Sequence, residues 1–168
     1  SVEVILARDY DQSASLPNYV LGTFNTPGEG RCGFTKKFVN SYLMADGTRF
    51  TDKPDYDKIE FVNEVSGRDP RLAQTIRTTK GLNFSNCITG YQPHKYIVEA
   101  NLGSSAASYN DLPLFRMAEV YLNYAEAKAE LGEITQGDLD ISVNKIRARA
   151  KMPNLNLKVA NDSPDPYL

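Results

Sequence analysis

The segment from Leu114 to Leu131 constrains the fold more than any other part of the chain. It contains no Gly or Pro and is rich in Ala, Leu, Met, Glu and Lys, which favour helices. Its polar residues recur at spacings of three and four and therefore share one narrow stripe: Arg116, Glu119, Asn123, Glu126 and Glu130. Nearly all other positions are apolar. This pattern is typical of a helix buried on most of its sides.

A second helix is predicted immediately after the first. Gly132 suits a left-handed helix C-cap, and Thr135 with Asp138 three residues later suits a capped helix start. We expect helices over about Leu112–Leu131 and Gln136–Ala150, packed antiparallel as in helical-repeat (TPR-like) folds. The charges of the buried helix need partners. We therefore expect a structural polar network that joins the stripe to the second helix, formed by Arg116, Glu119, Asn123, Glu126, Arg147 and Arg149.

The rest of the chain is predicted to be loop-rich. Residues 1–110 contain a β-branched run at 2–7, expected to be a short, locally paired strand, and a helix at 34–44 with Thr35 as its N-cap. Residues 72–79 are expected to be extended, 96–100 to form a strand, and 154–168 to be a frayed tail. The predicted fold class is mainly α, a single domain with a helical hairpin at 111–153, long loops and a few short β-strands.

Several motifs together resemble one protein family. The hairpin contains RMAEVYLNYAEAKAELG and NKIRARAKMP, and upstream stand, in order, VEVILARDY, FVNSYLMADGTRF and SGRDPRLAQTIRTT. This set is similar to the SusD/RagB family, outer-membrane lipoproteins that capture glycans or other nutrients. Family members are several hundred residues long. The resemblance therefore implies that this chain is a partial SusD-like domain, covering the central to C-terminal part.

The resemblance also implies a function. It predicts a non-enzymatic nutrient-binding protein, with an oligosaccharide or other nutrient as ligand. It implies delivery of that ligand to a TonB-dependent transporter of the SusC type. The implied location is the cell surface of the outer membrane, with a lipid anchor in the full-length parent. Two alternatives stay open: a helical-repeat adaptor that binds proteins or peptides, and a glycoside hydrolase.

Composition and motifs argue against other functions. Nineteen basic and 21 acidic residues give a formal charge of −2, and the bases are scattered, so no nucleic-acid partner is expected. The single histidine, His94, has no second histidine with which to build a metal site or triad. A G-x-G-x-x-G run at residues 28–33 lacks the strand context of a dinucleotide site. We therefore expect no cofactor and no metal, while Cys32 and Cys87 do not show whether they pair.

Aromatic side chains in loops are the candidate ligand contacts, because an aromatic face stacks on the apolar face of a sugar ring. Five lie in predicted loops or at strand ends: Tyr10, Tyr19, Phe24, Tyr91 and Tyr96. The chain has no tryptophan.

The apolar surface of the first predicted helix exceeds what the chain can cover. Only two other convincing helices are predicted, at 34–44 and 136–150. We therefore expect an exposed apolar patch on the first helix. Its expected members are Val120, Tyr121, Leu122 and Tyr124.

Overall fold

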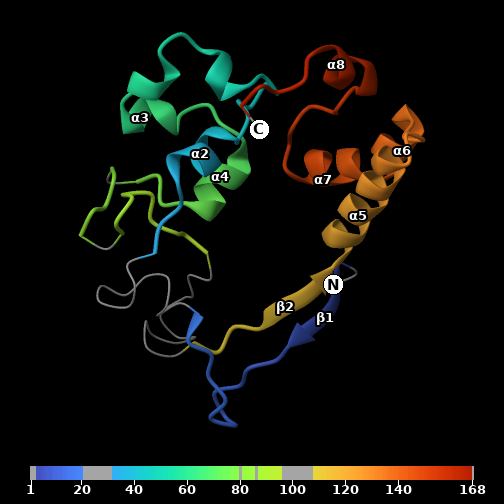
Figure 1. Cartoon of the computed structure of the whole chain (residues 1–168). Coiled ribbons are helices and arrows are strands. Elements are labelled where there is room, and N and C mark those ends of the chain that lie inside the picture. Colours follow the sequence, from blue (N-terminus) through green and yellow to red (C-terminus); the bar gives the residue numbers. More distant parts are fainter. Residues whose placement is uncertain (1–2, 21–31, 80, 86, 96–107, 168) are drawn as a thin grey trace.

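The computed structural model describes residues 3–20, 32–79, 81–85, 87–95 and 108–167. The fold is mainly helical with one two-stranded sheet, as the sequence predicts (Figure 1). The described elements, in chain order, are β1 (Val4–Arg8), α2 (Lys36–Asn40), the 3-10 helices η1 (Phe50–Asp52) and η2 (Tyr56–Lys58), α3 (Phe61–Glu64), α4 (Pro70–Thr75), β2 (Leu112–Arg116), α5 (Met117–Glu130), α6 (Gln136–Ile141), α7 (Val143–Arg149) and α8 (Leu157–Asp162).

The two strands come from distant parts of the chain. β1 confirms the predicted N-terminal strand, but its partner is β2, so the expected local pairing is wrong. The strands run antiparallel, with Val4 opposite Arg116 and Arg8 opposite Leu112. The predicted first helix is therefore too long at its start, because Leu112–Arg116 is extended and α5 begins only at Met117. Long-range pairing with β1 overrides the helical pattern there.

The helical hairpin is confirmed, with one change. Gly132 ends α5 with a positive φ of 68°, and the Thr135 and Asp138 side chains form a reciprocal capping box at the start of α6. The predicted second helix is divided at Ser142, whose φ of −127° and ψ of −93° interrupt it between α6 and α7. The Ser142 hydroxyl donates to the Asp138 carbonyl at 2.5 Å, a local bond that competes with helix continuation.

The main hydrophobic core lies outside the hairpin, among the short helices α2, α3 and α4 (Figure 1). Its buried members are Val39, Leu72, Ile76 and Tyr91, with Phe34, Tyr42, Phe61 and Val65 packed around them. Thr35 caps α2 as predicted, because its side chain accepts from the Phe38 N–H at 3.1 Å.

The extended prediction for residues 72–79 is wrong over its first part, where α4 spans Pro70–Thr75. Pro70 occupies the first helical position, and the Asp69 carboxylate accepts from the Arg71 N–H at 2.9 Å. Both are helix-start signals, and they outweigh the short alternating pattern of apolar residues.

Buried charges tie the short helices together. The Arg68 guanidinium lies 3.9 Å from the centre of the Phe50 ring and donates to the carbonyls of Val39 and Tyr42 at 2.8 and 2.7 Å. It also donates to the Glu64 carbonyl at 2.7 Å. One side chain thus links α2 to α3. Removal of this side chain would deprive all three carbonyls of its charged donor groups.

The C-terminal segment is ordered, which corrects the expectation of a frayed tail. It contains α8, capped by the Asn156 side chain, and Arg49 donates to the carbonyls of Ser163 and Pro164 at 3.1 Å each. The Tyr167 ring packs edge-on against Tyr56. Contacts with residues more than 100 positions earlier hold this segment, and local sequence patterns do not reveal such contacts.

Helix α5 is less buried than its sequence pattern suggests. Only Ala125 is buried, against α6 and α7, so the prediction of a helix buried on most sides is wrong for this chain. The predicted apolar patch is confirmed at three of its four positions, since Val120, Leu122 and Tyr124 are 46, 50 and 38% exposed, whereas Tyr121 is half-buried.

Candidate functional site

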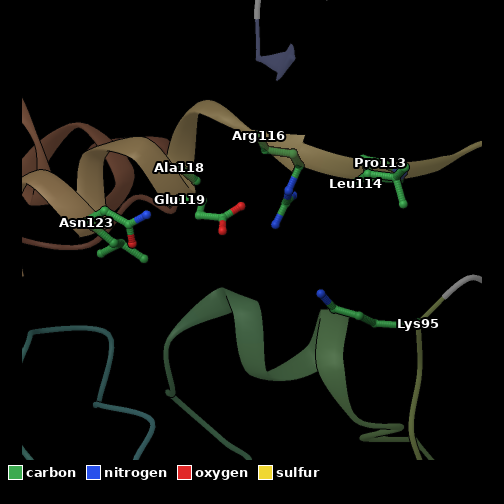
Figure 2. A pocket seen from close by; sticks show the side chains of 8 residues that line it. Lys95, Pro113, Leu114, Arg116, Ala118, Glu119 and Asn123 are labelled. Atoms are coloured by element: carbon green, nitrogen blue, oxygen red, sulfur yellow. The ribbon is translucent and has the colours of Figure 1, made fainter. Parts of the chain in front are cut away.

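A cleft of about 440 Å³ lies along β2 and the start of α5, with Lys95 on its opposite wall (Figure 2). Its lining divides into two chemical kinds. The polar side chains are Lys95, Arg116, Glu119 and Asn123, and the apolar ones are Pro113, Leu114, Ala118 and Leu122. A few polar groups above an apolar floor are typical of a small-molecule site.

The junction of β2 and α5 positions one wall. Arg116 ends the strand and occupies the N-cap position of α5 with an extended backbone, φ −132° and ψ 153°. The Met117 N–H donates to the Glu3 carbonyl at 2.9 Å, which fixes the helix start against the N-terminal segment. Glu119 follows Arg116 by three residues, and Asn123 follows Glu119 by four, which are helical spacings. All three side chains therefore project on one side.

Long-range backbone hydrogen bonds position Lys95 on the other wall. The His94 N–H donates to the Thr75 carbonyl at 2.8 Å, and the Arg77 N–H donates to the Gln92 carbonyl at 2.9 Å. These bonds hold the segment before Lys95 against the end of α4. The sequence gives no local signal for Lys95 as a site residue, because tertiary contacts alone bring it to the cleft.

The polar side chains of the cleft are available to a ligand. Among the described residues, no hydrogen bond or ion pair occupies the side chains of Lys95, Arg116, Glu119 or Asn123. Lysine and arginine supply donors, the glutamate supplies acceptors, and the asparagine amide supplies both. Together they can hydrogen-bond to the hydroxyls of a sugar, while the apolar floor contacts its C–H groups.

The predicted polar network between the two hairpin helices does not form. Arg149 pairs with Glu3 at 2.9 Å, and Arg147 donates to the Pro153 carbonyl at 2.6 Å. Within the described part of the chain, no ion pair joins Glu119 or Glu126 to an arginine, and both side chains are exposed. Helix α7 packs on the side of α5 that carries Ala125. The polar stripe therefore faces the cleft and solvent.

The predicted aromatic contacts are not gathered in this cleft. Tyr91 is buried in the core, Tyr10 is half-buried beneath the Arg8 guanidinium, and Tyr19 is 63% exposed. Phe24 and Tyr96 lie outside the described residues. None of the described aromatic residues lines the cleft.

The described residues contain no group of three or more His, Cys, Asp or Glu side chains arranged to hold a metal ion. None of the described helices has the length and apolar character that crossing a membrane requires.

Comparisons with known proteins place the chain in a structural context. The family model of the SusD family matches residues 3–86 and 78–165. The crystal structure of a SusD-like carbohydrate binding protein from Bacteroides fragilis NCTC 9343 is 26% identical, with a TM-score of 0.66, over 92% of this chain and 35% of that one. A SusD-like protein from the same organism is 21% identical, with a TM-score of 0.59, over 98% and 38%. This chain thus spans little more than a third of either structure. No curated protein matches its sequence.

Proposed function

The chain belongs to the SusD family, and on that premise we propose that it binds carbohydrate as part of a cell-surface nutrient-capture protein. The observation that carries the proposal is the cleft at the β2–α5 junction, whose four polar side chains have no partner among the described residues. A carbohydrate would satisfy them, because its hydroxyls act both as donors and as acceptors. The SusD-like carbohydrate binding protein from Bacteroides fragilis supports this ligand class by its name.

We propose binding without chemical conversion of the ligand. Glycoside hydrolysis ordinarily requires two carboxyl groups, about 5 to 9.5 Å apart, on either side of the scissile bond. Among the described residues, Glu119 is the only carboxylate that lines the cleft. A single acid can orient a sugar but does not supply both the acid and the base or nucleophile.

The finer parts of the proposal rest on the family alone. They are delivery of the ligand to a TonB-dependent transporter of the SusC type, and a place on the outer membrane through a lipid anchor of the full-length parent. Residues 1–168 would then be one partial SusD-like domain of that parent.

A glycan array followed by calorimetry tests the ligand class. We expect saturable binding of oligosaccharides to the 168-residue chain, weakened at least about tenfold in Asn123→Ala, the loss expected when one hydrogen-bonding side chain of a site is removed. Val62→Ala, which changes an exposed side chain on α3, is the matched control and should bind like the parent chain. Released reducing sugar would indicate a hydrolase, and the absence of any bound glycan would contradict the proposal.

A protein-binding adaptor is the second candidate. The exposed apolar side chains of α5 favour it, because such surfaces mark protein contacts more often than sugar contacts. Carbohydrate binding that is unaffected by replacement of Val120 and Leu131, two exposed apolar residues outside the cleft lining, would favour the first function.

A further inference from the structure

A second cleft continues the first. It has a volume of about 250 Å³ and shares Lys95 and Arg116 with the first cleft, so these two side chains stand at the junction. Its other charged lining residues are Arg71 from α4 and Arg149 from α7. Four positively charged side chains therefore line the second cleft. Three belong to helices or helix ends, namely α4, α7 and the start of α5, and the fourth is Lys95.

The positive charge at this junction is only partly compensated. Arg71 pairs with the buried carboxylate of Asp69 at 2.5 Å, and Arg149 pairs with Glu3 at 2.9 Å. Lys95 and Arg116 have no carboxylate within ion-pair distance among the described residues. In the part of the chain that the structure describes, no acidic residue lines the second cleft, and Glu119 lines the first cleft but not the second.

The arrangement concentrates like charges. Figure 2 shows the Lys95 and Arg116 side chains reaching into the same space from opposite walls. Nearby, burial lowers the pKa of Arg147, and the positive charge of Arg71 lowers it further. Such crowding is unfavourable unless an anion separates the cations. It is also local, because the chain as a whole carries a formal charge of −2.

We propose that the two clefts form one site for carbohydrates that carry an anionic group, a uronate carboxylate or a sulfate ester. Lys95 and Arg116 hold the anion at the junction, and the neutral part of the sugar lies against Glu119, Asn123 and the apolar floor of the first cleft. The arginine fork suits both anions, since its parallel N–H groups match two oxygens of a carboxylate or a sulfate. This inference rests on the proposed carbohydrate-binding function and specifies its ligand class.

Matched ligand pairs test the proposal by calorimetry on the 168-residue chain. One pair is an oligogalacturonate and its neutral methyl ester, and the other is a sulfated galactan oligosaccharide and its desulfated form. We expect the charged member of at least one pair to bind about tenfold or more tightly, with a preference that decreases as salt is raised. The pair that shows the preference distinguishes a carboxylate site from a sulfate site.

Two variants locate the site. Arg116→Gln and Lys95→Gln should each remove most of the preference for the charged ligand, about tenfold, while Lys58→Gln should leave it unchanged. Lys58→Gln is the matched control, because this substitution removes one exposed positive charge on η2, outside both clefts. Thermal unfolding of each variant checks that it folds like the parent chain.

The outcomes separate this inference from the function on which it rests. Equal binding of charged and neutral forms overturns the anionic site and leaves carbohydrate binding intact. A charged preference that survives both variants overturns the location. Inorganic sulfate, followed by chemical shifts of the Lys95 and Arg116 side chains, tests the anion site without sugar. Shifts there without binding of any glycan would contradict the proposed function alone, and no shifts would contradict the site.

Discussion

The Tyr91 side chain lies in the core beside the buried carboxylate of Glu64. Its hydroxyl donates to both carboxylate oxygens of Glu64, at 3.1 Å each, in the core between α3 and α4. Burial, followed by the charge of Glu64, raises the pKa of Tyr91. The tyrosine is therefore a neutral donor that satisfies a buried carboxylate. A loop position alone suggested a ligand contact, because sequence does not show which aromatic residues are drawn into a core.

Tyr91→Phe should destabilise the protein by about 1–3 kcal/mol, because the buried Glu64 carboxylate loses its side-chain donor. Chemical denaturation at neutral pH measures the change. Tyr121→Phe is the matched control, since its half-buried ring keeps the contact with the Lys145 ammonium group. Equal stabilities of the two variants would show that the Tyr91–Glu64 hydrogen bond contributes little.

Asp138 provides a pH-dependent contact within the hairpin. Hydrogen bonds from the Thr135 hydroxyl, the Tyr124 hydroxyl and the Thr135 N–H lower the pKa of Asp138 to about 2. In the unfolded chain an aspartate titrates near about 3.9. Because the folded value is lower, the carboxylate stabilises the fold above about pH 4, and this contribution is lost as the pH falls from about 4 to 2.

Side-chain carbon NMR of Asp138 should therefore show a midpoint close to 2 in the folded protein. Asp138→Asn should flatten the dependence of stability on pH between about 4 and 2. Glu126→Gln, which changes an exposed acid on α5, should leave that dependence in place. A native Asp138 that titrates near about 3.9 would contradict the capping arrangement.

At the scale of elements, the two sides of α5 differ in what covers them. Ala125 is buried where α6 and α7 pack, whereas Ala127, two residues later, is exposed. Ala125→Leu should destabilise the chain by about 1–3 kcal/mol through overpacking. Ala127→Leu should change stability by no more than about 0.5 kcal/mol. Thermal unfolding of the pair tests the packed face, and equal effects would contradict it.

The sequence predicts correctly those helix ends and helices that are determined by contacts between residues close together in the chain. The caps at Thr35 and Thr135, the C-cap at Gly132 and the helical hairpin follow from short-range patterns and are present. Two features depend on distant partners and do not follow from local patterns: the strand character of 112–116 and the ordered tail with α8. The break at Ser142 is local, since its hydroxyl bonds to the Asp138 carbonyl four residues earlier, but the apolar spacing of the second helix does not reveal it. Helix α4 differs, because its start signals at Asp69 and Pro70 are local and outweigh the alternating apolar pattern that predicts an extended segment.

The candidate site was predicted in part for the same reason. The spacing of Arg116, Glu119 and Asn123 correctly places them on one side. Their expected role in a buried network is wrong, because α7 covers a different face of α5. Lys95 completes the cleft through backbone hydrogen bonds to the end of α4, and no periodicity in the sequence reflects those bonds.

At the scale of the whole molecule, burial is uneven. The core lies among α2, α3 and α4, while the β1–β2 ribbon and one side of α5 carry exposed apolar side chains. On α5 and at its C-cap, Val120, Tyr124, Ala127 and Leu131 follow helical spacings of four, three and four and form one row, and Leu122 is exposed outside this row. We expect a row of this kind, exposed to water, to attract other apolar surfaces.

The 168-residue chain should therefore bind a hydrophobic dye such as ANS and self-associate with increasing concentration. Val120→Ser combined with Leu131→Ser should reduce both effects at least about twofold, because these residues are 46 and 70% exposed on the same row of α5. Val62→Ser, which changes a valine on α3 that is 68% exposed and lies outside this row, is the matched control and should change neither. Dye fluorescence and sedimentation velocity measure the two effects. A monomeric chain without dye binding would mean that this row is too small or too broken by polar neighbours to attract a partner, and the adaptor function would lose its structural support.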